Sequence, residues 1–191
     1  MKKLVRLILK ILLLIVCALV FIVVFFPESN LNIFSECVKV PKEYVDTVNK
    51  AGNVCENITP ELVAAVIQTE SKWNPNVTSH AGAKGLGQFM SETFNAVGQD
   101  GDGDGKAEIN NPYDSIYSTG VYLCKLHEEV TFWKTNNNVE ESAINLSLAA
   151  YNAGLGNVKK YAGTPPFEET KNYVEKITAI MQNPKCTSFI P

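Results

Sequence analysis

A chain of 191 residues has room for one domain and a short appendage. Its net charge is -3, and basic and acidic residues are mixed along the chain except for a basic N-terminus. No stripe of positive charge is present outside that N-terminus, so nucleic acid is not an expected partner.

The N-terminus combines basic residues with an apolar run. The run extends from about residue 7 to residue 26 and is long enough to cross a bilayer as a helix. The positive-inside rule places its N-terminal side in the cytoplasm and everything after Pro27 outside. No small-x-small cleavage site follows the run, which favours an uncleaved anchor over a signal peptide. We therefore expect residues 1–27 to be a cytoplasmic tip and a single-pass anchor in the cell membrane. The basic residues are Lys2, Lys3, Arg6 and Lys10.

The cysteines indicate an oxidising compartment. Cys17 falls in the apolar run, and four further cysteines fall outside it. An even number in an exported domain fits two disulfides, with three possible pairings, and the alternative is four buried free thiols. No Cys-x-x-Cys or Cys/His spacing indicates zinc. The four cysteines are Cys37, Cys55, Cys124 and Cys186.

Residues 28–54 form a juxtamembrane stretch with one short helical candidate, from Pro41 to Lys50, and we expect a compact domain at residues 55–191. In that domain the sequence indicates helices separated by loops rich in Gly, Asn and Asp, and no alternating pattern indicates strands. The sequence therefore predicts a single all-α domain, or nearly so. The predicted helices span residues 60–70, 91–95, 114–129, 140–151 and 170–181.

Glu70 lies on the apolar face of the first of these helices. Thr59 and Pro60 are typical of a helix N-terminus, and Val66 and Ile67 follow at helical spacing on the side of Glu70. A carboxylate on an apolar face is either buried with partners or used for chemistry, because desolvation raises its pKa and favours the proton-donating form. The alternative is a glutamate at a helix end that turns out to solvent, and this helix alone does not decide between them.

An acidic loop is a candidate metal site. Residues 100–111 copy positions 1, 3, 5, 6 and 9 of an EF-hand calcium loop, but Asn111 stands where the bidentate glutamate is required. Asp114 is close enough in sequence to supply that carboxylate. We expect a structural calcium site rather than a catalytic cofactor, and the alternative is a flexible acidic loop. The candidate ligands are Asp100, Asp102, Asp104, Glu108 and the carbonyl of Lys106.

Several blocks in a fixed order resemble the catalytic domain of the soluble lytic transglycosylases, relatives of goose-type lysozyme that cleave peptidoglycan. The resemblance covers roughly residues 58–181, and it implies a lysozyme-like helical fold, α+β at most. The blocks are Glu70-Ser71, Trp73-Asn-Pro75, Ser79, residues 81–90 (AGAKGLGQFM), residues 148–154 (LAAYNAG) and residues 169–174 (ETKNYV).

The resemblance implies that Glu70 is the catalytic acid. Such enzymes cut the β-1,4 bond between N-acetylmuramic acid and N-acetylglucosamine, and the muramoyl 6-hydroxyl attacks to leave a 1,6-anhydro product. One carboxyl group with a raised pKa suffices for that scheme. Ordinary glycosidases need a second carboxylate, and Glu92, Asp100 and Asp114 do not match a nucleophile position. A hydrolytic muramidase and a non-catalytic peptidoglycan-binding scaffold remain the alternatives.

The resemblance also implies a set of substrate-binding residues and an association with a conjugation or secretion complex. Three residues have structural alternatives: a loop serine bonded to its own backbone for Ser79, a structural tyrosine for Tyr151, and a core aromatic for Tyr173. Gly85 and Gly87 are expected to let the backbone approach the sugar, although the family usually has Met where Gly87 stands. The implied set is Ser79, Gln88, Met90, Tyr151, Asn152 and Tyr173.

In related domains, cysteines at the places of Cys55 and Cys124 look like a disulfide pair. That pairing leaves Cys37 with Cys186, which would join the juxtamembrane stretch to the C-terminal tail. Each closed loop would contribute about 3 to 5 kcal/mol.

Overall fold

The computed structural model describes residues 37–183. The predicted anchor at residues 1–27 and Cys186 lie outside them, and no helix within them is long and apolar enough to cross a membrane. Over this range the chain forms seven α-helices and one 3-10 helix, and its only β pairings are isolated bridges at Lys84. The all-α prediction is confirmed for this part of the chain. The elements are η1 (Lys42–Tyr44), α2 (Val45–Ala51), α3 (Pro60–Ser71), α4 (Ser91–Val97), α5 (Pro112–Asn137), α6 (Ala143–Ala153), α7 (Leu155–Tyr161) and α8 (Glu168–Gln182).

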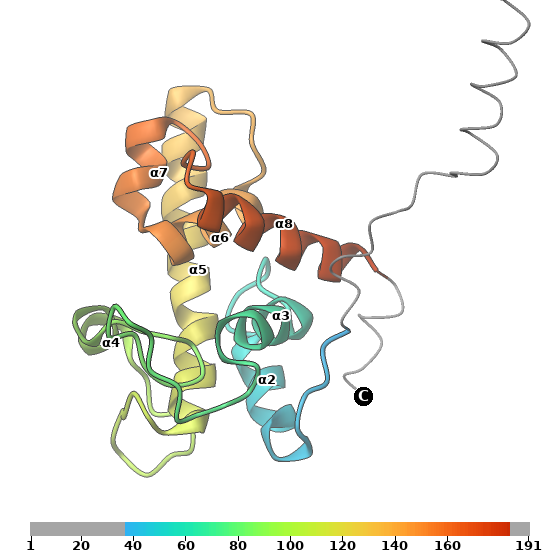
Figure 1. Cartoon of the computed structure of the whole chain (residues 1–191), viewed down its shortest axis with the longest axis vertical. Coiled ribbons are helices and arrows are strands. Elements are labelled where there is room, and N and C mark those ends of the chain that lie inside the picture. Colours follow the sequence, from blue (N-terminus) through green and yellow to red (C-terminus); the bar gives the residue numbers. More distant parts are fainter. Residues whose placement is uncertain (1–36, 184–191) are drawn as a thin grey trace, which may run out of the picture. The chain divides into compact units, whose positions relative to one another are not determined.

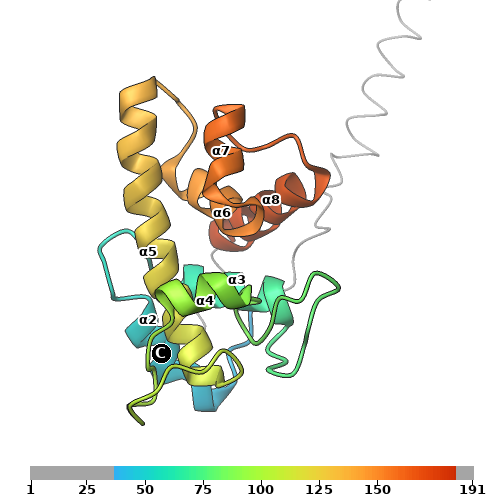
Figure 2. The same ribbon diagram turned by 90° about the vertical axis from the view of Figure 1, so that its left-hand side faces the viewer.

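The long helix α5 is the element on which the others are arranged. It begins where the Asn111 side chain accepts hydrogen bonds from two backbone N–H groups of the first turn, with Pro112 at its first position. In Figures 1 and 2, α2, α3 and α4 lie along its N-terminal half and α6 and α7 lie along its C-terminal half, while α8 packs on α6 and α3. Gly120 allows the contact with α2, because a Cβ there would lie 2.1 Å from the Ala51 carbonyl oxygen.

Helix α3 forms as its sequence predicts. The Thr59 hydroxyl accepts the backbone N–H of Leu62, and Pro60 occupies the first turn. Its residues from Val63 to Ile67 are fully buried. The helix ends at Lys72, which adopts a left-handed conformation with φ of 51° and turns the chain away just after Glu70.

The packed core begins before residue 55, where the domain boundary was predicted. Val38, Val48 and Ala51 are at most 1% exposed and belong to the same core as α3 and α5. Residues 28–54 were predicted to be a juxtamembrane stretch with one short helical candidate, from Pro41 to Lys50. Helix α2 instead packs on α3 and α5, so the packed core extends to the N-terminal side of residue 55.

Two helix predictions needed correction near the C-terminus. Helix α6 begins after Ser142, whose hydroxyl caps it, so Glu140 and Glu141 lie outside it. Helix α7 was not predicted, because its seven residues bury only Val158 and no side chain caps it. Gly154, with φ of 85°, makes the sharp junction between these two helices. Helices α4, α5 and α8 were predicted in place, each with shorter bounds than observed.

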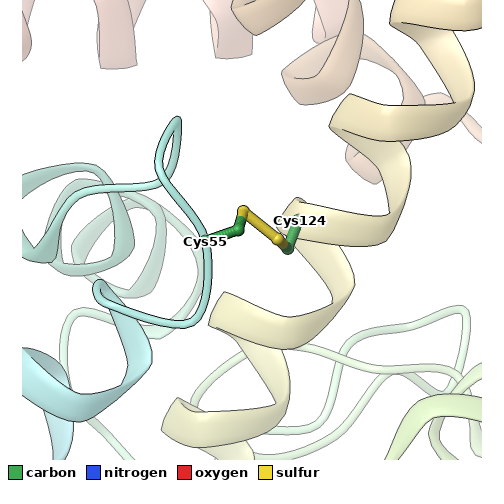
Figure 3. Close-up of a disulfide and its surroundings, with 2 residues drawn as sticks. All are labelled: Cys55 and Cys124. Atoms are coloured by element: carbon green, nitrogen blue, oxygen red, sulfur yellow. A yellow bond between two sulfur atoms is a disulfide. The ribbon is translucent and has the colours of Figure 1, made fainter.

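A disulfide joins Cys55 to Cys124 across 69 residues, as the resemblance implied. Figure 3 shows it connecting the loop after α2 to the middle of α5. Cys37 is disulfide-bonded as well. Its predicted partner, Cys186, lies outside the described residues, so that pairing stays a prediction.

Candidate active site

A cleft of about 400 Å³ lies where the end of α3, the segment between α3 and α4, α5 and the α6–α7 junction meet. It brings together five of the six predicted substrate-binding residues and the predicted acid. A larger depression of about 630 Å³ lies between α4 and residues 107–112, and it contains none of them. The cleft is lined by Glu70, Ser79, Ala81, Ala83, Gln88, Phe89, Met90, Thr93, Tyr122, Tyr151, Asn152, Ala153, Gly154 and Glu169.

Glu70 stands at the end of α3 with its carboxyl group largely withdrawn from water. Burial raises the pKa of this carboxyl from 4.5 to about 7; a hydrogen bond from Tyr173 opposes the shift, and the negative charge of Glu169 adds to it. A carboxylic acid with a pKa near neutrality can both donate and accept a proton at the pH of most cells. The alternative of a solvent-directed helix-end glutamate does not fit this environment.

The chain turns sharply after Glu70, which places the next segment over the cleft. Lys72 and Trp73 both have positive φ, 51° and 65°. Two consecutive non-glycine residues in this region are costly and persist only where the surroundings impose them. The Trp73 ring stacks on Tyr44 at a centroid distance of 6.0 Å, and this contact holds the turn against η1.

Tyr173 reaches Glu70 from the protein interior. Its hydroxyl donates to Oε1 of Glu70 at 2.7 Å, and its ring is only 7% exposed, in the core with Val174 and Ile177. It does not line the cleft. Tyr173 is thus the core aromatic that was its alternative, and its hydroxyl bonds to the predicted acid.

The segment from Ser79 to Met90 forms one wall of the cleft. The Ser79 hydroxyl accepts the backbone N–H of Ala83 at 3.0 Å, so the loop-stabilising alternative for this serine is observed while its side chain also lines the cleft. The Gln88 amide nitrogen donates to the carbonyls of Val77 (3.2 Å) and Gly85 (2.9 Å). Both amide hydrogens are thereby used, so Oε1 is the Gln88 atom that can accept from a ligand.

The two glycines before Gln88 serve the packing of the protein itself. A Cβ at Gly85 would lie 2.2 Å from the Ile109 carbonyl oxygen, just before α5, and one at Gly87 would lie 2.5 Å from Thr119 Oγ1 on α5. The expectation that they also make room for a sugar stays a prediction. A methionine at position 87, which the family usually has there, would meet the same Thr119 side chain.

The opposite wall comes from the end of α6. The Tyr151 hydroxyl donates to the Gly87 carbonyl at 2.7 Å, and the Asn152 side-chain oxygen accepts from the Thr170 hydroxyl at 2.7 Å. Both side chains line the cleft. Tyr151 therefore acts as a structural tyrosine, which was the alternative to a substrate-binding role, and it also lines the cleft that contains Glu70. Asn152 connects the cleft to α8.

Several cleft residues were not singled out from the sequence, among them Glu169 and Tyr122. Glu169, in the first turn of α8, lines the cleft as a second acid, and it is exposed. Tyr122 extends from α5 and packs its ring against Tyr151 at 5.4 Å. Glu169 lies within one of the motif blocks, which was the available signal. Tyr122 follows the apolar pattern of α5 and carries no signal that separates it from a core residue.

The acidic loop folds as a tight turn around its own side chains. Ligand oxygens of Asp100, Asp102 and Asp114 lie within 4.8 Å of one another. Gly105 has φ of 89°, as the sixth position of an EF-hand loop requires, and its N–H donates to Asp100. Asn111 cannot act as the twelfth ligand in the usual way, because its side-chain oxygen caps α5.

This arrangement fits calcium in part. Asp114 supplies the carboxylate that Asn111 lacks, but both its oxygens also accept backbone N–H groups, from Gly101 and Glu108. Three carboxylates of this kind suit an oxygen-loving divalent cation. Asp104 and Glu108 are exposed and stand outside the three-residue cluster. The calcium site stays a prediction, which calorimetric titration with Ca²⁺ tests.

Fold and cleft together define an α-helical domain equipped for general acid chemistry, with one desolvated carboxylic acid and polar groups able to bind a hydroxyl- and amide-rich ligand. The chain belongs to the transglycosylase SLT domain family, whose model matches residues 47–174. The resemblance noted from the sequence motifs is thereby confirmed.

Similar relatives carry the names of lytic murein transglycosylases. The chain is 33% identical over 124 residues to "Membrane-bound lytic murein transglycosylase C" of Actinobacillus pleuropneumoniae, covering 62% of this chain and 33% of the relative. It is 29% identical over 144 residues to "Soluble lytic murein transglycosylase" of Escherichia coli strain K12, covering 65% and 20%.

Among solved structures, the 70 kDa soluble lytic transglycosylase of Escherichia coli is similar with a TM-score of 0.57 and 28% identity, over 73% of this chain and 23% of that one. The chain thus spans about a third or less of the length of these relatives.

Proposed function

We propose that this chain is a peptidoglycan lytic transglycosylase in which Glu70 is the catalytic acid and base. The proposal rests above all on the environment of Glu70, whose pKa of about 7 suits a group that must give and then take a proton. Membership of the transglycosylase SLT domain family supports the same reaction. The substrate is the glycan strand of peptidoglycan, cut at the β-1,4 bond between N-acetylmuramic acid and N-acetylglucosamine.

The reaction begins with protonated Glu70. Because Tyr173 donates to Oε1, that oxygen acts as an acceptor and the acid proton is carried on Oε2. Oε2 gives this proton to the glycosidic oxygen as the bond to the anomeric carbon breaks. Glu70 is then a carboxylate beside an oxocarbenium-like sugar, and its negative charge stabilises the positive charge on that sugar.

The second step uses the same residue as a base. Glu70 takes the proton of the muramoyl 6-hydroxyl while that oxygen bonds to the anomeric carbon, which closes the 1,6-anhydro ring and regenerates the acid. Water is neither consumed nor released, and no second carboxylate takes part. Gln88 Oε1, the Asn152 amide and exposed Met90 are placed in the cleft where they would contact the N-acetyl groups and sugar faces.

Hydrolysis is the second candidate reaction, and the presence of Glu169 in the cleft is the observation that supports it. It is a second carboxylate in the same cleft, as a glycosidase that activates water requires. Glu169 is exposed, unlike Glu70, and the proposed reaction needs no second carboxylate. The two reactions leave different chain ends, a 1,6-anhydro sugar or a reducing sugar.

Digestion of purified peptidoglycan tests the proposal. Residues 37–191 are incubated with sacculi, and the released muropeptides are separated and weighed by mass spectrometry. We expect 1,6-anhydro ends with the unmodified protein and none with Glu70→Gln. Reducing muramic acid ends would establish the muramidase alternative. Binding to sacculi without any release, by the unmodified protein, would establish a non-catalytic scaffold.

The cellular setting is a further part of the proposal. The basic and apolar pattern of residues 1–27 supports a membrane anchor that holds the enzyme facing the cell wall. Tethering would restrict wall cleavage to the neighbourhood of a conjugation or secretion complex. Fractionation of cells that express the full chain, compared with the chain from residue 37 carrying an export signal, tests the anchor. Recovery of the full chain in the soluble fraction would contradict it.

A further inference from the structure

Both polar backbone groups of Gly87 are held by side chains from two different helices. Its N–H donates to Oγ of Ser115 on α5 at 2.9 Å, and its carbonyl accepts from the hydroxyl of Tyr151 on α6 at 2.7 Å. Ser115 is fully buried. Figure 1 shows α5 and α6 side by side in the centre of the domain. The wall of the cleft is therefore fastened to α5 and α6 at one residue.

Thr119 removes the remaining freedom at this point. It lies one turn after Ser115 on the same helix, is fully buried, and donates to the Ser115 carbonyl at 2.8 Å. Its Oγ1 lies 3.4 Å from the Tyr151 hydroxyl and would lie 2.5 Å from a Cβ at residue 87. Gly87 thus lies so close to α5 that a side chain at this position would clash with Thr119.

The residue that follows Gly87 shows what the fastening does. Gln88 has φ of 49°, which a non-glycine residue adopts at a cost unless its neighbours impose it. Its side-chain amide is turned back onto the carbonyls of Val77 and Gly85. Because Gln88 directly follows Gly87, the bonds that hold Gly87 restrain its backbone, and the two amide bonds leave Oε1 as the Gln88 atom that can accept from a ligand in the cleft.

We propose that Ser115 is a positioning residue for glycan binding, because it holds Gly87 and thereby Gln88 and Met90 in the wall of the cleft. This inference rests on the proposed function in one respect, that the cleft takes a glycan. Ser115 does not touch the cleft itself and is not among the residues that line it. The hydrogen bonds of Ser115 join it to Gly87, Thr119 and Asn111, and none of them involves Glu70.

Ser118 offers a matched control on the same helix. It is also fully buried, and its Oγ accepts a backbone N–H, that of Gln99, at 2.8 Å. Neither Ser118 nor Gln99 lines the cleft. Ser115→Ala and Ser118→Ala therefore each remove the hydroxyl acceptor of one backbone N–H, in a buried bond for Gly87 and in a part-buried bond for Gln99, which is an exposed residue. Only the first loosens the wall that carries Gln88.

The experiment measures steady-state cleavage of a soluble peptidoglycan tetrasaccharide, and binding of the same fragment in the Glu70→Gln background. For Ser115→Ala we expect KM and Kd to rise about five- to tenfold, which corresponds to the free energy that one hydrogen bond contributes. The kcat value and its alkaline pH midpoint should stay unchanged, because Glu70 keeps its surroundings. Ser118→Ala should change neither KM nor Kd.

Equal KM and Kd values for Ser115→Ala and Ser118→Ala would overturn the proposal, as would a loss confined to kcat. If Ser115→Ala does not fold, Ser115→Cys replaces it, since it retains the size and a weak acceptor; its Kd must then still exceed that of Ser118→Ala. An unmodified protein that binds but does not cleave the fragment would refute the proposed function alone. The binding comparison would still decide the role of Ser115.

Discussion

The hydroxyl of Tyr173 donates a 2.7 Å hydrogen bond to Oε1 of Glu70, although 103 residues separate the two in the chain. The bond joins the end of α3 to the middle of α8, inside the core. Burial raises the pKa of the Tyr173 hydroxyl well above 10, so it remains a donor over the whole range in which Glu70 titrates. This core tyrosine therefore occupies Oε1 of Glu70, which leaves Oε2 as the oxygen that would carry the proton in the proposed reaction.

Replacing Tyr173 by Phe should raise the pKa of Glu70 further. The hydrogen bond stabilises the carboxylate and lowers the pKa, and its loss leaves burial and Glu169 unopposed. Since cleavage needs protonated Glu70, the rate falls as pH rises through the pKa, about 7 in the unmodified protein. In Tyr173→Phe this alkaline limb should move to higher pH, and kcat should fall about tenfold because the carboxyl is less precisely held.

The measurement is the pH dependence of kcat/KM. Tyr161→Phe is the control, because that tyrosine is exposed on α7 and its hydroxyl has no part in the cleft. An alkaline limb that moves to lower pH in Tyr173→Phe would show that the hydrogen bond does not favour the carboxylate.

Removing the charge of Glu169 should shift Glu70 in the opposite direction. The negative charge of Glu169 raises the pKa of Glu70, so Glu169→Gln should move the alkaline limb to lower pH. The side chain is exposed, and the difference from the unmodified protein should therefore shrink as salt is added. Glu168→Gln, a neighbouring exposed acid that does not line the cleft, should leave the profile unchanged. Loss of all activity in Glu169→Gln, at every pH, would instead assign it a direct part in the chemistry.

Glu70 should reduce the stability of the protein at alkaline pH. Its pKa is about 7 in the folded protein and near 4.5 when exposed to water, so folding favours the protonated form. The stability that this preference contributes is complete below about pH 4.5 and is lost as pH rises through 7. Glu70→Gln stays neutral and avoids the loss, so at pH 8 it should be more stable than the unmodified protein, by on the order of 3 kcal/mol.

Urea unfolding of the two proteins at pH 5 and pH 8 checks this expectation. The advantage of Glu70→Gln should be small at pH 5 and large at pH 8, and an advantage of equal size at both values would contradict the raised pKa. Gln can still accept the hydrogen bond from Tyr173 through Oε1, so the comparison isolates the charge.

Gly87 should tolerate no side chain, whereas Gly156 should. A Cβ at Gly87 would lie 2.5 Å from Thr119 Oγ1 and 2.6 Å from the Phe89 ring. Gly87→Ala should therefore cost about 1 to 3 kcal/mol or more and weaken glycan binding. Gly156, in helix α7, has nothing within 4 Å of such a Cβ. Gly156→Ala should be neutral or stabilising by up to about 1 kcal/mol.

Thermal unfolding of both alanine variants, with binding to sacculi as the second readout, separates the two positions. Equal melting temperatures would mean that the cleft wall moves away from α5 at little cost, which would also weaken the case for Ser115 as a positioning residue.

Local sequence signals predicted much of the helical architecture. Thr59 and Pro60 mark the start of α3, and apolar spacing located α5 and α8, because caps and periodicity act over a few residues. The start of the packed core before residue 55 and helix α7 were not predicted, because such local signals are missing in both segments. Val38 lies outside the helices and Val158 is the one buried residue of the seven-residue helix α7, so neither segment has an apolar pattern long enough to show its burial.

The sequence by itself determined the family and indicated Glu70 as the candidate acid, because motif order and the apolar face that carries Glu70 are properties of the chain. Only the tertiary structure decided what Tyr173, Ser115 and Glu169 do. Tyr173 acts on Glu70, Ser115 on Gly87, and Glu169 on the charge of the cleft, and each of these relationships joins residues far apart in the chain. Hydrogen bonds and charges act through distance in space, and the packing of α3, α5 and α8 creates those distances.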